Sequence, residues 1–153
     1  MKNTPGLEMM QRASRFGEHK MYYFAYASNL SRKQMSERCP DAQPKFTATL
    51  PNYKLIFARG SRIQPSGVAT IKRAQGSKVH GAIYEVSDKC LRSLDKCEGC
   101  PTVYTRINVI VFTEFGEPIE ATTYIKNPPF EEIQPSREYL AVIHQGYQDW
   151  GIV

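Results

Sequence analysis

The stretch Tyr22-Tyr23-Phe24-Ala25-Tyr26-Ala27-Ser28-Asn29-Leu30 changes character in its middle. Residues 22–25 are aromatic or small, which is typical of a buried strand. Ala27-Ser28-Asn29 is small and polar, and a first helical turn is predicted from Ser31. A strand that ends in such a turn and leads into a helix leaves several backbone N–H groups unpaired and directed at one region. These groups can hold an anion, or an oxygen that becomes negative in a reaction, although an ordinary strand-to-helix turn has the same pattern.

The rest of the chain is predicted to consist mainly of short strands. They are expected at Lys45–Leu50, Tyr53–Ala58, Gly67–Arg73, Val79–Val86, Tyr104–Phe115 and Ile119–Lys126. Pro51-Asn52 and Gln75-Gly76-Ser77 are interpreted as turns between strands. Helices are predicted at 31–38, from the N-cap Ser87 to about Lys96, and from Pro135-Ser136 onward. About six or seven strands and about three helices predict an α+β domain whose sheet is closed or half-closed.

Length and composition fit one globular domain. The chain has 153 residues, of which 41% are hydrophobic and 23% charged. Residues 1–20 are polar and are predicted to be an N-terminal tail, with residues 21–153 forming a single domain. The sequence has no apolar run of transmembrane length and no secretory signal pattern, so a cytoplasmic protein with no membrane partner is expected.

The net charge of +5 raises the possibility of a nucleic-acid partner. The Lys and Arg residues are scattered, however, and a small acidic substrate explains a mild basic excess equally well. We therefore expect no nucleic-acid partner, and a monomer or a homodimer.

The cysteines are expected to be free thiols, because the compartment is expected to be reducing. The four are Cys39, Cys90, Cys97 and Cys100. The last two form a C-x-x-C motif, but it closes a predicted helix, whereas a thioredoxin-like motif opens one. A zinc site needs a second close pair, and the histidines are far apart in the sequence, so no metal is expected.

Six blocks of the sequence resemble, in the same order, those of the gamma-glutamylcyclotransferase family. YFAYASNL at 23–30 is similar to the YFAYGSNL stretch that opens the family, with Ala27 in place of its glycine. The other blocks are GVATI at 67–71, GAIYEV at 81–86, LDKCEGCPTVY at 94–104, TYIKN at 123–127 and PSREYLAVIHQG at 135–146. The resemblance covers residues 21–150 and implies a small mixed β-barrel with helices around it.

The resemblance also implies a chemistry. The family converts a γ-glutamyl amino acid or amine to 5-oxoproline and the free amine, without a cofactor, and Glu98 falls on its catalytic glutamate. Without the resemblance, the residues favour the interpretation of Glu98 as a solvated glutamate on the surface. The helix dipole disfavours a carboxylate at a helix C-terminus, however, and a glutamate at such a position therefore suggests a functional role. Substrate contacts are expected from residues on either side of the reacting atoms, namely Tyr23, Phe24, Ala25, Tyr26, Ala27, Ser28, Asn29 and Tyr139.

Several interpretations stay open. Tyr139 is either a substrate contact or one more aromatic of the core, and Tyr104 and Tyr124 either line a pocket or pack the barrel. If Ala27 has a positive φ, its methyl group costs roughly 1 kcal/mol; if not, the methyl merely narrows the pocket. Ala27 also favours a second hypothesis, that the protein binds γ-glutamyl or related small molecules without turning them over.

The enzyme hypothesis makes a structural prediction. The backbone of Tyr26, Ala27 and Ser28, the carboxylate of Glu98 and the ring of Tyr139 must line one cavity. Partial burial there is expected to raise the pKa of Glu98.

Overall fold

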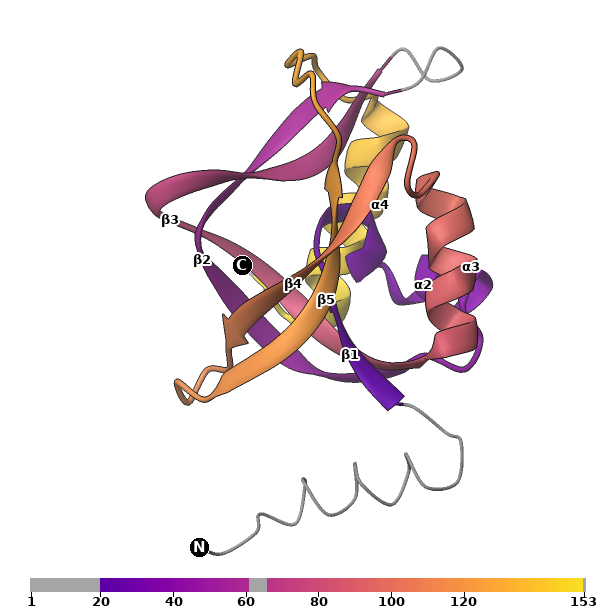
Figure 1. Ribbon diagram of the computed structural model, residues 1–153, viewed down its shortest axis with the longest axis vertical. Coiled ribbons are helices and arrows are strands. Elements are labelled where there is room, and N and C mark those ends of the chain that lie inside the picture. The colour runs from indigo at the N-terminus through magenta and orange to yellow at the C-terminus, as the bar shows by residue number, and fades with distance from the viewer. Residues whose placement is uncertain (1–19, 61–65, 153) are drawn as a thin grey trace, which may run out of the picture.

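The computed structural model describes residues 20–60 and 66–152 (Figure 1). The predicted N-terminal tail, except for Lys20, lies outside these residues. Within the described residues, no helix is long and apolar enough to cross a membrane.

In this part of the chain, five strands form a closed barrel in the order β1-β3-β2-β4-β5 (Figure 1). The strands are β1 (Lys20–Ala25), β2 (Gln43–Arg59), β3 (Gly67–Ser87), β4 (Tyr104–Phe112) and β5 (Pro118–Lys126). Neighbouring strands are antiparallel, except that β1 pairs with β5 in parallel, where Tyr23 faces Thr122, and so closes the barrel. The mixed barrel confirms the expected fold class.

The strand count corrects the prediction of six or seven. Pro51-Asn52 and Gln75-Gly76-Ser77 do not separate strands, because β2 and β3 each run through them. The register of β2 against β3 shifts between Pro51 and Tyr53, and Asn52 takes a φ of 63° at that point. Asn52 Oδ1 accepts a hydrogen bond of 3.1 Å from the N–H of Gly76 on the neighbouring strand. These turn-forming residues make a bulge in a long strand pair, where bulges bend strands without ending them.

The predicted helices are confirmed as α2 (Arg32–Arg38), α3 (Asp88–Glu98) and α4 (Arg137–Trp150), and a 3-10 turn, η1 (Ala27–Leu30), precedes α2. Each α-helix begins after a serine whose hydroxyl accepts a backbone N–H bond, which satisfies one of the free donors at a helix start. α3 runs to Glu98 and ends at Gly99, which takes the left-handed conformation with φ 65°.

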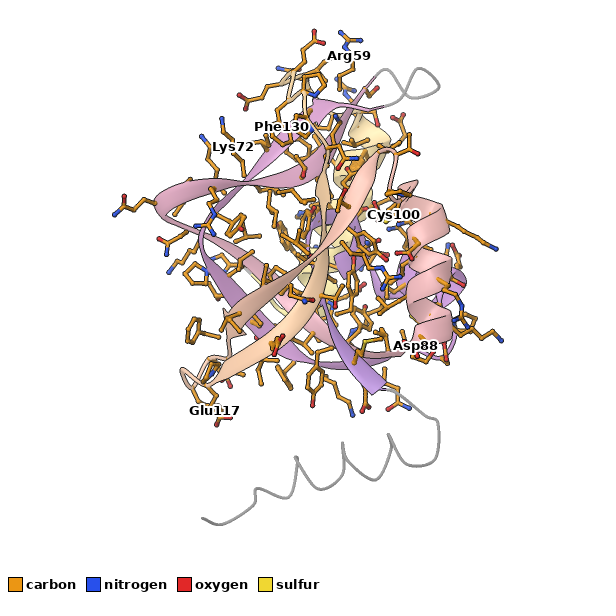
Figure 2. All side chains as sticks on the ribbon, in the orientation of Figure 1. Arg59, Lys72, Asp88, Cys100, Glu117 and Phe130 are labelled. Carbon is orange, nitrogen blue, oxygen red and sulfur yellow. A yellow bond between two sulfur atoms is a disulfide. The ribbon has the colours of Figure 1, made fainter. Side chains whose placement is uncertain are left out.

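The core lies partly inside the barrel and partly between the barrel and the helices. Phe24, Ile83 and Val111 are fully buried in the first part, and Leu91 and Leu94 of α3 pack in the second. α2 and α3 lie beside each other on one flank of the barrel (Figure 1). Figure 2 shows Asp88 and Cys100 near opposite ends of α3.

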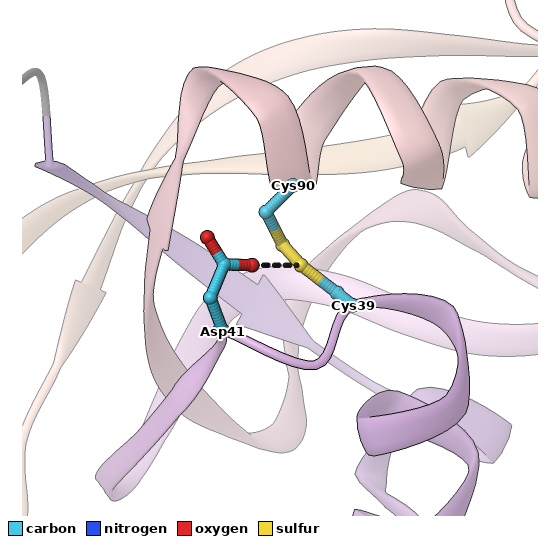
Figure 3. Close-up of side chains that lie close together, drawn as sticks. All are labelled: Cys39, Asp41 and Cys90. Atoms are coloured by element: carbon cyan, nitrogen blue, oxygen red, sulfur yellow. Dashed lines mark hydrogen bonds between the residues drawn. A yellow bond between two sulfur atoms is a disulfide. The ribbon is translucent and has the colours of Figure 1, made fainter.

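The expectation of four free thiols is wrong for two of the cysteines. Cys39, which follows α2, and Cys90, in the first turn of α3, form a disulfide with their Cα atoms 5.3 Å apart (Figure 3). The residues are 51 positions apart in the sequence, so no local pattern indicates that they meet. Cys97 and Cys100 are free.

Candidate active site

A cavity of about 560 Å³ lies where η1, the end of α3 and the start of α4 meet the barrel. As predicted, Tyr26, Ala27, Ser28, Glu98 and Tyr139 all line it. Tyr23 and Asn29 line it too. Phe24 and Ala25, which were also expected to contact substrate, are fully buried in β1 and are not among the lining residues. A strand presents alternate side chains to opposite faces, so Phe24 cannot face the side of β1 from which Tyr23 lines the cavity.

The turn that follows β1 has an unusual backbone. Tyr26 is extended, with φ −135° and ψ 164°, and Ala27 then takes a φ of 54°. The first N–H groups of a helical turn have no partner inside it, so those of Ala27 and Ser28 are available at the start of η1. The positive φ answers the question that the sequence left open. A left-handed alanine is strained by about 1 kcal/mol, whereas glycine is not.

Helix α4 holds this turn in place. Gly146 lies so close to it that a Cβ atom there would be 2.7 Å from both Leu30 Cβ and Ser31 N. Trp150 Nε1 donates a 2.9 Å hydrogen bond to the carbonyl of Leu30, and the N–H of Arg32 donates one of 3.0 Å to Asp149 Oδ2. These contacts lie at the C-terminal end of η1 and immediately after it, and they hold the turn against α4.

Glu98 is the last residue of α3, and its side chain is 15% exposed. Its Oε1 accepts a 3.1 Å hydrogen bond from Asn29 Nδ2 and lies 3.4 Å from Arg38 Nη1. Asn29 Nδ2 also donates to the hydroxyl of Tyr23, at 2.6 Å. Burial raises the pKa of Glu98 above its ordinary value, while Arg38 and Asn29 lower the pKa in part. The expected direction of the shift is confirmed.

The tyrosines that were left open line the cavity as well as packing the barrel. The hydroxyl of Tyr139 accepts a 3.1 Å hydrogen bond from the N–H of Ala69, and Tyr104 donates one of 2.7 Å to the carbonyl of the same residue. Tyr124 instead donates to Asp95 Oδ1, at 2.6 Å. Burial raises the pKa of Tyr104 and of Tyr139, so both hydroxyls stay protonated near pH 7.

Sequence reasoning missed the polar residues that α2 contributes to the site, Gln34 and Arg38. Gln34 Nε2 donates to Ser28 Oγ at 3.2 Å and to Asn29 Oδ1 at 3.0 Å, and Arg38 Nη1 donates to the same Asn29 oxygen at 2.8 Å. The two residues are four positions apart, which puts them on one face of a helix. That spacing, directly after the turn, is the signal that could have found them.

One group of side chains could hold a metal ion in the described part of the chain, and it lies away from this cavity. The ligand atoms of Cys39, Asp41 and Cys90 are within 4.8 Å of one another (Figure 3). Zinc binds cysteine as the thiolate, so these two sulfurs, which are joined in a disulfide, offer no such ligand.

The comparisons with known proteins agree with this geometry. A family model described as gamma-glutamyl cyclotransferase, AIG2-like, matches residues 23–150. The gamma-glutamylcyclotransferase of Bos taurus is 34% identical over 135 residues, which cover 85% of this chain and 71% of the bovine protein. That of Homo sapiens is 32% identical over 140 residues, covering 88% of this chain and 74% of the human protein. A solved structure of a gamma-glutamyl cyclotransferase superposes with a TM-score of 0.81 at 32% identity, over 88% of this chain and 82% of that one. The chain therefore belongs to the AIG2-like gamma-glutamyl cyclotransferase family.

Proposed function

We propose that this protein is a gamma-glutamylcyclotransferase, which converts a γ-glutamyl amino acid or amine to 5-oxoproline and the free amino acid or amine. The observation that carries the proposal is that the carboxylate of Glu98 and the backbone turn at Ala27 and Ser28, about seventy residues apart, line one cavity. A base and a set of oxyanion donors on one cavity are what a cyclisation of this kind requires.

The reaction is intramolecular. The α-amine of the substrate attacks its own γ-carbonyl carbon and forms the C–N bond of a five-membered lactam, and the bond between the γ-carbonyl and the leaving amine breaks. No atom enters from outside, so neither a cofactor nor a co-substrate is needed. The amine and the carbonyl are already joined in one molecule, so the cavity acts by holding the chain between them in the conformation that brings the two groups into near-attack geometry.

Glu98 takes the role of the base. A free α-amine has a pKa of about 8 and is mostly protonated at pH 7, so it must lose a proton before or during attack. Glu98 accepts that proton and delivers one to the leaving nitrogen. The burial that raises its pKa makes it a better proton acceptor than an exposed glutamate while the hydrogen bond from Asn29 holds its orientation.

The tetrahedral intermediate carries its negative charge on the former γ-carbonyl oxygen. The N–H groups of Ala27 and Ser28 are the donors for that oxygen, because the small side chains there permit close approach. Tyr139, on the other side of the cavity, contacts the substrate through its ring. Its hydroxyl is held by Ala69.

The substrate is a small molecule, and its place in metabolism is the turnover of γ-glutamyl compounds such as those derived from glutathione. The protein acts in the cytoplasm as a monomer or a homodimer, without nucleic acid or membrane.

One observation favours a second candidate, a binding protein without turnover. Ala27 takes a positive φ at the position where the similar stretch of the family has glycine, so the oxyanion turn is strained. The experiment that separates the two is incubation with a panel of γ-glutamyl compounds, with 5-oxoproline measured by chromatography. The proposal expects 5-oxoproline in equal amount to the released amine. Binding of a panel member by calorimetry without any 5-oxoproline would establish the second candidate instead.

A further inference from the structure

Arg38 stands in the candidate site with most of its hydrogen-bonding capacity unused. It lies at the end of α2, lines the cavity, and its side chain is 28% exposed. Its Nη1 donates to Asn29 Oδ1 at 2.8 Å and lies 3.4 Å from Glu98 Oε1, whereas its Nε and Nη2 make no hydrogen bond within the described residues. A guanidinium has five N–H donors in a planar fork that matches the two oxygens of a carboxylate.

The charges of Arg38 and Glu98 are complementary to those of an amino-acid head group, which carries an amine and a carboxylate. In such a head group the amine and the carboxylate are bonded to one carbon, which puts the amine nitrogen and the carboxylate carbon about 2.5 Å apart. In the site, a cation and an anion face the same cavity 3.4 Å apart. That distance is longer than a well-formed N–H···O bond, so the two groups are only loosely paired and each can take a new partner.

We propose that Arg38 binds the α-carboxylate of the γ-glutamyl substrate and so determines that only substrates with a free α-carboxylate are used efficiently. The inference rests on the proposed function, in which Glu98 receives the proton of the α-amine. If the amine is at Glu98, the carboxylate on the same carbon lies within reach of Arg38 and can accept two of its donors. Asn29 is hydrogen-bonded to both Arg38 and Glu98 and so fixes the position of the two groups relative to each other.

A second cation, Lys96, also lines the cavity, but it is less suited to this role. Its side chain is exposed, and no hydrogen bond fixes its ammonium group within the described residues. Arg38 is anchored through Asn29, which reduces the conformational freedom that it loses when a ligand binds. Lys96 therefore provides a matched control, since replacing it removes one positive charge from the same cavity.

The test compares two substrates that release the same product. One is γ-glutamyl-alanine, and the other is its analogue in which the glutamyl α-carboxylate is a primary amide, so that released alanine measures both. We expect the wild-type kcat/KM for the amide to be lower by about tenfold or more, as for loss of a hydrogen bond between charged groups. In Arg38→Gln the difference between the two substrates is expected to fall to about threefold or less, because the side chain that distinguishes them is gone. Arg38→Lys is expected to keep an intermediate preference for the carboxylate substrate over the amide. Lys96→Gln is expected to keep the full wild-type preference.

The ratio of the kcat/KM values for the two substrates distinguishes a binding role of Arg38 from a structural one. If Arg38 only supports Glu98 or the fold, Arg38→Gln slows both substrates equally and the ratio stays at its wild-type value, which would overturn the inference. A wild-type protein that uses both substrates equally well would overturn it too. If wild type releases no alanine from either compound, the proposed function fails. In that case calorimetry measures the affinity of wild type and of Arg38→Gln for each of the two compounds. The inference then predicts that wild type binds the carboxylate compound more tightly than the amide, and that Arg38→Gln loses most of this difference.

Discussion

Replacing Gly146 by alanine tests how helix α4 positions the oxyanion turn, because two physical effects predict opposite signs. Alanine is favoured over glycine inside a helix by about 0.8–1.0 kcal/mol, so helix propensity alone predicts a more stable protein. The added methyl group, however, would lie 2.7 Å from Leu30 Cβ and from Ser31 N, and 2.8 Å from the carbonyl carbon of Leu30. Attractive contacts of carbon atoms lie at about 3.5–4.0 Å, so this methyl is deep in the repulsive range.

The repulsion is expected to decide the sign. Two of the three atoms belong to the backbone, and a change of side-chain rotamer cannot move them away. Overpacking of this kind costs typically about 1–3 kcal/mol, which leaves Gly146→Ala less stable by up to about 2 kcal/mol after the gain in propensity. Displacement of the turn by a fraction of an ångström also misdirects the N–H groups of residues 27 and 28, so a loss of turnover of about tenfold or more is expected.

Urea denaturation followed by the fluorescence of Trp150, the single tryptophan, measures the change in stability. Ala141→Gly is the matched control, because Ala141 is an exposed residue of the same helix and reports the propensity difference without a packing term. It is expected to lose about 1 kcal/mol and to keep wild-type turnover. A Gly146→Ala protein that is more stable than wild type and fully active would refute the reasoning about the turn.

Three further predictions follow from the site and its surroundings. Ala27→Gly relieves a positive φ worth about 1 kcal/mol but loses a buried methyl worth up to about 0.8 kcal/mol, so stability in urea is expected to change little, with turnover unchanged or higher. A large drop in turnover would contradict the assignment of the oxyanion donors. For the disulfide, the separation of 51 residues between Cys39 and Cys90 gives about 4 kcal/mol of stabilisation in the chain-entropy model. A reductant is therefore expected to lower the thermal midpoint of wild type and not that of the double variant Cys39→Ser, Cys90→Ser; equal responses would contradict a formed disulfide. In the pH profile of kcat/KM, the raised pKa of Glu98 predicts an acid limb with its midpoint above 4.5. Because the folded pKa is above the unfolded one, the stability of wild type relative to Glu98→Gln is greatest at low pH and is lost as the pH rises through the folded pKa; a midpoint at or below 4.5, or the opposite trend in stability, would be inconsistent with a buried Glu98.

Much of the fold could be predicted because the local signals agree with one another. The strand at 22–25, the small-residue turn, the serine N-caps and the glycine after Glu98 are each determined by near neighbours, and all appear in the structure. The strand count failed for a physical reason. Pro51-Asn52 is a turn signal, but in a long pair of twisted strands the same residues form a bulge, and only the partner strand decides between the two outcomes.

The candidate site was predicted in part. The approach of Glu98 to the turn was expected from the requirements of the chemistry and from the resemblance, and the cavity confirms that they meet. The φ of Ala27 could not be deduced, because alanine normally avoids the left-handed region and no neighbouring residue in the sequence indicates the exception. The pairing of Cys39 with Cys90 depends on how α2 lies against α3, which is a tertiary contact that no local pattern specifies.

The central claim is that Glu98 is the base of a cyclisation, and Glu98→Gln tests it most directly, because the amide keeps the shape and the hydrogen bond from Asn29 while it loses the proton acceptor. Turnover of the γ-glutamyl compound that wild type uses best is to be measured as 5-oxoproline, with binding of the same compound measured by calorimetry. The account predicts a loss of turnover of about 100-fold or more with the affinity changed much less. A Glu98→Gln protein that forms 5-oxoproline within a few-fold of the wild-type rate would contradict it.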